Sequence, residues 1–175
     1  MFRGMMYGSY QKPRELLWVL GWLTYVLLCA LGFTGYVLPW GQMSFWAAQV
    51  ILSLVGSIPV FGEELLTWIR GDYLISGITL NRLFAFHVVL LPLALIAVVF
   101  VHILALHEVG SNNPDGVDVK KFKDEDGVPL DTKPFFPYDV MHDLYAIGVF
   151  LIFFVTIMFF YPDGGGYVIE YVNYE

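Results

Sequence analysis

The sequence predicts an all-α integral membrane protein with three transmembrane helices and a few short helices that lie on the membrane surface. Of its 175 residues, 58% are hydrophobic and 14% are charged, against about 45–50% and about 25% in soluble domains. Three apolar stretches are each long enough to cross a bilayer, which takes about 20 helical residues. Aromatic residues make up 18% of the chain and gather at the ends of these stretches, as interface belts do.

The apolar stretches and the Pro- and Gly-rich segments between them define the order of the predicted elements. Residues 42–72 are also apolar, but Gly56, Pro59 and Gly62 divide them into pieces too short to span a bilayer, which favours amphipathic surface helices. The predicted order is a lead-in (1–13), a transmembrane helix (14–39), surface helices (42–72), a second transmembrane helix (80–108), a polar loop (109–137), a third transmembrane helix (138–161) and a tail (162–175).

The distribution of positive charge predicts the orientation. Seven of the nine Lys and Arg residues lie before residue 15 or between residues 120 and 133. The positive-inside rule therefore places the N-terminus and the 109–137 loop in the cytoplasm, and residues 42–72 and the tail on the outer side. The net charge of −7 argues against a nucleic-acid partner.

Two histidines in the second span are the first candidates for chemistry. Fifteen residues separate His87 from His102, which corresponds to about 22 Å of rise and about 60° of rotation on a straight helix. Pro92 lies between them, and a local widening or kink there could bring both imidazoles onto one face. Two haem-sized cofactors, one in each leaflet, would fit this separation. The alternative is a pair of core histidines that bond to neighbouring helices.

Glycines in the first span provide a second, independent spacing. Gly21 and Gly35 are fourteen residues apart, about 21 Å of rise and about 40° of rotation. Small residues on a transmembrane helix allow close approach, usually by another helix. Because the glycine interval nearly matches the histidine interval, the two gaps could instead receive the edges of two flat macrocycles.

The strings GYVLPWGQMSFW, LNRLFAFH, HEVGSNNP and YGSYQKPRE resemble cytochrome b of proteobacterial cytochrome bc complexes, the quinol–cytochrome c reductases. The resemblance covers essentially the whole chain in order and implies the middle part of the cytochrome b helical bundle. On this resemblance we expect a central fragment without the two N-terminal helices that carry the other axial histidines. We also expect it to lack the Pro-Glu-Trp-Tyr segment of the outer site.

The resemblance implies two haem b groups and assigns residues to them. His87 matches an axial iron ligand of the outer, low-potential haem, and His102 matches one of the inner, high-potential haem. Gly21 and Gly35 match the glycines against which these haems pack. Further residues expected near the haems are Arg3, Ser9 and Trp18 on the inner side and Arg82 on the outer side.

The resemblance also implies two quinone sites. His107, Ser111 and Asp143 match the inner quinone-reduction site, with Phe135 at its wall. A histidine that ends one helix and a carboxylate that begins the next could hydrogen-bond both carbonyls of a quinone and deliver protons. The outer quinol-oxidation pocket is matched by Phe33, Tyr36, Met43, Ala47, Val50 and Ile51. Ala47 is commonly glycine in the family, and His142 stands where many relatives carry lysine.

The expected function is electron transfer from the outer quinol-oxidation site, through two haems, to the inner quinone-reduction site, coupled to proton translocation. The expected partners are an iron–sulfur protein, a cytochrome c-type subunit, the remaining cytochrome b helices, quinone and membrane lipid, in a dimeric complex of the bacterial inner membrane. Two alternatives stay open: a segment of a proton or ion transporter, which would favour more carboxylates within the spans, and an inactive structural fragment.

Overall fold

The computed structural model describes residues 1–118, 121–130 and 132–162, so the predicted tail lies outside the described residues from residue 163 onward. The described residues form two compact units, residues 1–111 and residues 112–162. All secondary structure described in them is helical, apart from an isolated antiparallel bridge between Lys123 and Pro129. The all-α prediction is therefore confirmed.

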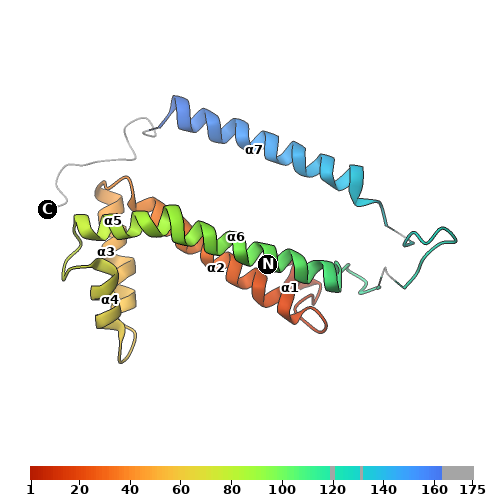
Figure 1. The fold of residues 1–175 in the computed structure, drawn as a ribbon, viewed down its shortest axis with the longest axis horizontal. Coiled ribbons are helices and arrows are strands. Elements are labelled where there is room, and N and C mark those ends of the chain that lie inside the picture. Colours follow the sequence, from red (N-terminus) through yellow and green to blue (C-terminus); the bar gives the residue numbers. More distant parts are fainter. Residues whose placement is uncertain (119–120, 131, 163–175) are drawn as a thin grey trace. The chain divides into compact units, whose positions relative to one another are not determined.

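The first unit is built on two long helices that lie side by side (Figure 1). The second of these helices is continuous, because a π-helical turn joins its two α-helical parts. The elements of this unit are α1 (Phe2–Met6), α2 (Glu15–Val37), α3 (Gln42–Gly56), α4 (Gly62–Arg70), α5 (Gly77–Ala85), the π turn η1 (Phe86–Leu90) and α6 (Leu91–Val109).

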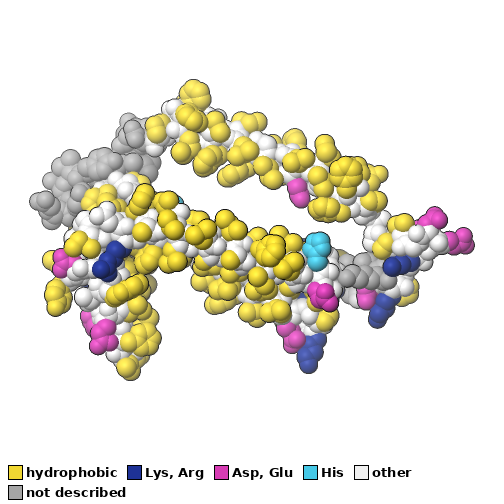
Figure 2. Space-filling model, viewed as in Figure 1, with side chains coloured by type: hydrophobic (Ala, Val, Ile, Leu, Met, Phe, Trp, Pro, Cys, Tyr) yellow, Lys and Arg dark blue, Asp and Glu magenta, His cyan; other side chains and the backbone are white. Residues whose placement is uncertain are grey.

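Three helices of the described residues are long and apolar enough to span a bilayer: 15–37, 77–109 and 135–160. Their side chains on the face shown in Figure 2 are mostly hydrophobic, and charged groups gather near the helix ends. This confirms the prediction of a multi-pass membrane protein. The second span begins at Gly77, earlier than residue 80, because Ser76 and Thr79 form a capping box at its start.

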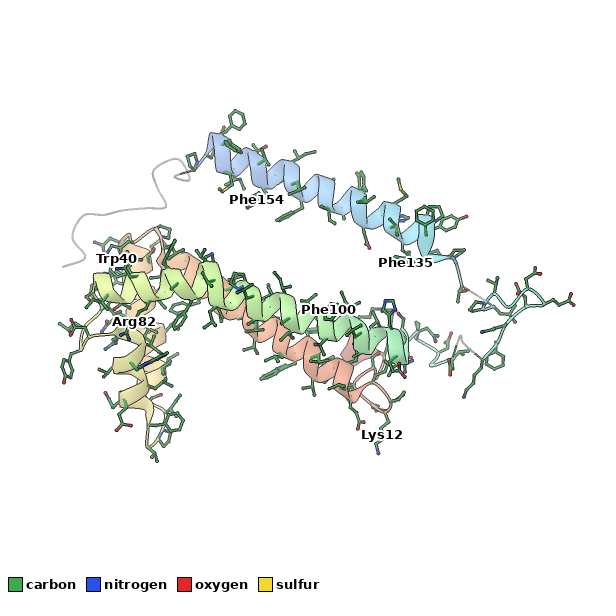
Figure 3. All side chains as sticks on the ribbon, viewed as in Figure 1. Lys12, Trp40, Arg82, Phe100, Phe135 and Phe154 are labelled. Carbon is green, nitrogen blue, oxygen red and sulfur yellow. The ribbon has the colours of Figure 1, made fainter. Side chains whose placement is uncertain are left out.

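Figure 3 labels the two ends of the α2–α6 pair, with Trp40 at one end and Lys12 at the other. At the Trp40 end, α3, α4 and α5 enclose a small buried core with the last turn of α2. The Thr79 hydroxyl donates to the Arg70 carbonyl at 2.8 Å and so joins the end of α4 to α5. Buried hydrophobic members of this core are Val37, Ala48, Leu52, Leu66, Ile75 and Leu83.

At the Lys12 end, the N-terminal segment and the end of α6 both attach to the start of α2. Arg14 precedes α2 and donates through Nε to the Gly110 carbonyl at 3.0 Å and through Nη2 to the Ser111 carbonyl at 3.4 Å. The last carbonyls of a helix have no partner within the helix, so this arginine closes the end of α6. The two spans are thus joined at both ends.

The second unit contains the π turn η2 (Phe135–Asp139) and the helix α7 (Val140–Phe160). Lys133 and Asp139 form an ion pair at 2.9 Å just before α7. Asp143 lies in the first turn of α7, where the helix dipole favours a negative charge.

Candidate functional site

Each histidine of the second span faces a glycine of the first. A Cβ atom built on Gly35 would lie 2.6 Å from Cε1 of His87, and one built on Gly21 would lie 3.1 Å from Cε1 of His102. Non-bonded contacts of a Cβ atom below 3.0 Å essentially never occur in proteins. The His87 ring therefore occupies a space that only glycine leaves open, and the His102 ring lies in a slightly wider one. Both imidazoles point from the second span toward α2.

The π turn η1 explains why two unequal sequence intervals match in space. The N–H of Leu91 donates to the carbonyl of Phe86, five residues back, so this turn holds one residue more than an α-helical turn. Fifteen residues that include one such turn therefore have the rise and rotation of fourteen α-helical residues. The rise is about 21 Å, and the rotation is about 40° less than four full turns. This is the interval between Gly21 and Gly35.

The hydrogen bonds of His87 determine which ring nitrogen carries the proton. Nδ1 lies 3.0 Å from the Leu31 carbonyl oxygen and 3.2 Å from Oγ1 of Thr34. The Thr34 hydroxyl donates to the carbonyls of Ala30 and Leu31, at 2.9 and 3.1 Å. Both neighbours of Nδ1 therefore accept, and Nδ1 must be the donor. The lone pair of the neutral ring is then on Nε2, the nitrogen that would be free to bind a metal.

His102 has no such support. Its Nδ1 is buried and has no hydrogen-bond partner among the described residues. Leu20, directly before Gly21, offers no hydroxyl where the other pair has Thr34. A buried ring nitrogen without a partner is costly in an apolar surrounding, so the ring of His102 is held less firmly than the ring of His87.

Taken together, the two pairs fit a pair of flat, metal-centred groups. Neutral imidazole is a common axial ligand of haem iron. Each glycine leaves the space that the imidazole occupies against α2, so both rings are held at a fixed depth of the helix pair. No group of three or more His, Cys, Asp and Glu side chains in the described part of the chain could hold a bare metal ion. The two histidines lie far apart on one helix, so they could not share an ion.

The lead-in residues come together at the Lys12 end. Gly4 of α1 packs against the indole of Trp18, because a Cβ on this glycine would lie 2.7 Å from the ring. The N–H of Ser9 donates to the Gly4 carbonyl at 2.8 Å, and the Arg3 guanidinium lies 5.3 Å from the ring centre of Tyr7. Arg3, Ser9 and Trp18 therefore share one end of α2, the end at which His102 and Gly21 lie.

The residues predicted for the inner quinone site divide between the two units. His107 and Ser111 are exposed at the end of α6, where Arg14 holds the backbone of Ser111. Asp143 is exposed in the first turn of α7, and Phe135 is 65% exposed in η2. Each set is described within its own unit, so the predicted site stays a prediction.

The residues predicted for the outer quinol site lie near the Trp40 end. The Ser44 hydroxyl donates to the Tyr36 carbonyl at 2.8 Å and fixes the start of α3 against the end of α2. Ala48 and Leu52 face the core, which leaves another face of α3 outward. Met43, Val50 and Ile51 are exposed on that outward face, Tyr36 is exposed on α2, and Phe33 and Ala47 are half-buried.

Arg82 turns toward α4. Its Nη1 donates to the Trp68 carbonyl, and the guanidinium borders Gly71. Arg82 also lines a surface pocket of about 580 Å³ with Glu63, Glu64, Trp68 and Tyr73. The side chain therefore braces the connection between α4 and the second span at the Trp40 end.

Sequence reasoning missed three contributors to the site. Thr34 and the Leu31 carbonyl hold His87, and Arg14 holds the end of α6. The sequence signal available for Thr34 was a threonine directly before Gly35 in an otherwise apolar span, since a hydroxyl within a membrane needs a hydrogen-bond partner. No sequence signal connected Arg14 to a backbone 96 residues away.

Comparison with known proteins identifies relatives along the whole chain. The family model described as cytochrome b (N-terminal)/b6/petB matches residues 1–164. The chain is 52% identical to cytochrome b of Allochromatium vinosum over 179 aligned positions, covering 100% of this chain and 43% of that protein. It is 47% identical to cytochrome b of Rhodospirillum rubrum, covering 98% of this chain and 40% of that protein. The chain thus spans about two fifths of the length of these relatives.

A solved structure resembles the fold. A chain of a hyperthermophilic respiratory Complex III aligns with a TM-score of 0.74 and 34% sequence identity, over 93% of this chain and 43% of that one. The two chains are therefore similar in sequence as well as in fold.

Proposed function

The chain belongs to the cytochrome b family, and on this premise we propose that it forms part of the membrane electron-transfer subunit of a quinol–cytochrome c reductase. The observation that carries the proposal is the pair of His–Gly contacts, His87 with Gly35 and His102 with Gly21, at two depths of one helix pair. The relatives are named cytochrome b, and one similar solved structure is a respiratory Complex III.

His87 and His102 are proposed as axial ligands of two haems b, at the outer and the inner depth respectively. Bound haem b would supply reversible one-electron transfer. The chain itself provides one imidazole at each depth, an adjacent glycine that makes room for this imidazole, and an apolar surrounding. Further residues that hold each haem would come from the other helices of the subunit.

The chain also provides candidate quinone-binding groups at both ends. At the outer end, the exposed apolar face of α3 with Phe33 and Tyr36 would hold the ring and tail of a quinol. At the inner end, His107, Ser111 and Asp143 would hydrogen-bond a quinone and exchange protons with it, since imidazole and carboxylate are the usual proton carriers. Separate sites on the two sides of the membrane would couple electron transfer to proton translocation.

The proposed setting is a bacterial inner membrane, with the N-terminus and the 109–137 loop in the cytoplasm. The basic residues before residue 15 support this orientation. The proposed partners are an iron–sulfur protein, a cytochrome c-type subunit and the remaining helices of cytochrome b, in a dimeric complex.

The test is to replace each histidine by alanine in the complete subunit, assembled in its membrane complex. His87→Ala and His102→Ala should each remove one of two b-type haems, because the remaining ligand cannot hold the iron at full affinity. His142→Ala is the matched control: this histidine lies on α7 and bonds through Nδ1 to the Tyr138 carbonyl.

The measurements are the reduced-minus-oxidised optical spectrum and the haem content per complex. The expected result is two haems in the control and one in each of the other variants, with a different haem lost each time. Retention of both haems in His87→Ala and His102→Ala would reject the ligand assignment.

A further inference from the structure

The two histidines are held differently, although their backbones are spaced alike. His87 donates from Nδ1 to two acceptors, the Leu31 carbonyl and the Thr34 hydroxyl. Thr34 is only 5% exposed, and its hydroxyl proton is directed at the carbonyls of Ala30 and Leu31. The oxygen of Thr34 therefore presents its lone pairs to the imidazole, and the acceptor is fixed within the helix that carries it.

Thr34 is also placed to set the angle of the ring. It directly precedes Gly35, whose missing side chain makes room for the same imidazole. One neighbour thus leaves the space for the ring, and the other orients the ring within it. The rotation of a histidine about its side-chain bonds costs little by itself, so a fixed acceptor on the opposite helix decides which way Nε2 points.

We propose that Thr34 is a positioning residue for His87, which orients the imidazole through Nδ1–H and makes it a more electron-rich iron ligand than His102. This inference rests on the proposed haem-binding function. An acceptor at Nδ1–H raises the basicity of a metal-bound histidine. A more basic ligand favours the oxidised, more positively charged iron, and hydrogen bonding around the ligands is one of the means by which proteins tune haem potentials. The bond therefore lowers the potential of the outer haem and leaves the inner haem unaffected.

The test is Thr34→Val in the complete subunit within its complex. Valine has nearly the shape of threonine but carries a methyl group in place of the hydroxyl. A methyl carbon at the position of Oγ1 would lie 3.2 Å from Nδ1, inside normal carbon–nitrogen contact, so the ring must also turn.

Two matched variants accompany it. Thr24→Val removes a hydroxyl from the same helix, one that donates to the Leu20 carbonyl at 2.9 Å. Thr34→Ser keeps a hydroxyl at the critical position. Thr34→Ala serves as a second hydroxyl-free variant if the valine variant does not accumulate.

The readouts are redox titrations of the two b haems and the electron paramagnetic resonance spectra of the oxidised complex. We expect Thr34→Val to raise the midpoint potential of the outer haem by about 28 mV. For a one-electron couple, this corresponds to a roughly threefold change in the equilibrium constant for reduction. The resonance of that haem should also shift, because the ligand ring has turned. Thr34→Ser should restore both quantities, and Thr24→Val should change neither.

Loss of the outer haem alone in the hydroxyl-free variants, with rescue by Thr34→Ser, would also support the proposal. An unchanged outer potential and resonance in Thr34→Val would overturn it, and so would an equal shift in Thr24→Val. These outcomes are distinct from failure of the proposed function. If His87→Ala removes the outer haem while Thr34→Val has no effect, the ligand assignment stands and only the role of Thr34 is rejected.

Discussion

The His87–Gly35 pair at the Trp40 end and the His102–Gly21 pair at the Lys12 end share one backbone interval but differ in how the imidazole is held. The first ring is tightly enclosed, with 2.6 Å between Cε1 and a Cβ built on the glycine, and it is hydrogen-bonded at Nδ1. The second has 3.1 Å in the same comparison and a buried Nδ1 without a partner in the described residues. Spacing and ligand chemistry are therefore set by separate residues.

The two His–Gly pairs therefore have nearly the same backbone geometry but different hydrogen bonding at the imidazole. Glycines fourteen residues apart fix the depths of the two gaps, and the π turn brings the histidines into the same register. What lies directly before each glycine, Thr34 or Leu20, then decides whether the ring has an acceptor. If the two proposed haems bind at these histidines, a difference of this kind would separate their potentials without any change in the helix pair.

The largest effect is expected from filling the glycine gaps. In the complete subunit, Gly35→Ala would place a methyl group 2.6 Å from the His87 ring, and Gly21→Ala would place one 3.1 Å from the His102 ring. Overpacking costs about 1–3 kcal/mol, or roughly fivefold to 150-fold in affinity. We expect Gly35→Ala to lose most of the outer haem and Gly21→Ala to lose less of the inner one, measured as haem content per complex.

Gly32→Ala is the control for these two variants, since a Cβ on Gly32 would meet nothing within 4 Å. It should retain both haems, because only the helix propensity changes, and alanine is the better helix former. Equal haem loss in Gly32→Ala and Gly35→Ala would mean that the glycines act through the helix backbone rather than through room beside the histidines.

The π turn offers the next largest effect. Deletion of Leu90 should convert η1 into a regular α-helical turn and leave fourteen residues between the histidines, the same interval as between the glycines. Both haems should be retained. Insertion of one alanine after Ile96 should instead rotate His102 by about 100° relative to His87 and remove one haem.

The reduced-minus-oxidised spectrum of both variants decides between these outcomes. If the deletion removed a haem and the insertion did not, the registers of histidines and glycines would not be matched through η1.

Some features of the two His–Gly pairs could be predicted from the sequence, and others could not. The three spans, the intervals of histidines and glycines and a local distortion near Pro92 all follow from residue counting and from the chemistry of proline. The hydrogen bond between Thr34 and His87 joins residues 53 positions apart, and its existence depends on the rotation of one helix against another. The rotation of a helix about its axis can be predicted from the spacing of apolar residues only if one face is polar. In α2 and α6 nearly every face is apolar, so the sequence does not show which face meets the other helix.

The same reason explains the other contributors that were missed. Arg14 is one of several basic residues near the N-terminus, and its charge alone predicts orientation rather than a bond to Gly110. Ser76 and Thr79 cap the start of α5 through side-chain bonds, and polar composition alone does not distinguish such capping residues from a loop. The hydrogen-bonding capacity of each side chain could be predicted from the sequence, but which residues contact one another is known only from the fold.

The smallest effect should come from giving the inner pair the acceptor that only the outer pair has. Leu20→Thr puts a hydroxyl directly before Gly21, the position that Thr34 holds before Gly35, fourteen residues later. His102 Nδ1 is buried and unpartnered among the described residues, so a nearby acceptor would remove an unsatisfied group. Threonine is a poorer helix former than leucine by about 0.5 kcal/mol, a small cost within a 23-residue helix.

If the acceptor makes the ligand more electron-rich, Leu20→Thr should lower the midpoint potential of the inner haem and bring the two potentials closer together, with the outer potential unchanged. The expected shift is no larger than the roughly threefold change expected for Thr34→Val, about 28 mV, since the new hydroxyl lacks the supporting Leu31 carbonyl contact. Leu20→Val, which is β-branched but has no hydroxyl, is the control in the same redox titration. If Leu20→Val lowers the midpoint potential of the inner haem by the same amount, the effect comes from packing. The difference between the two haem potentials would then have a cause other than the hydrogen bond at Nδ1.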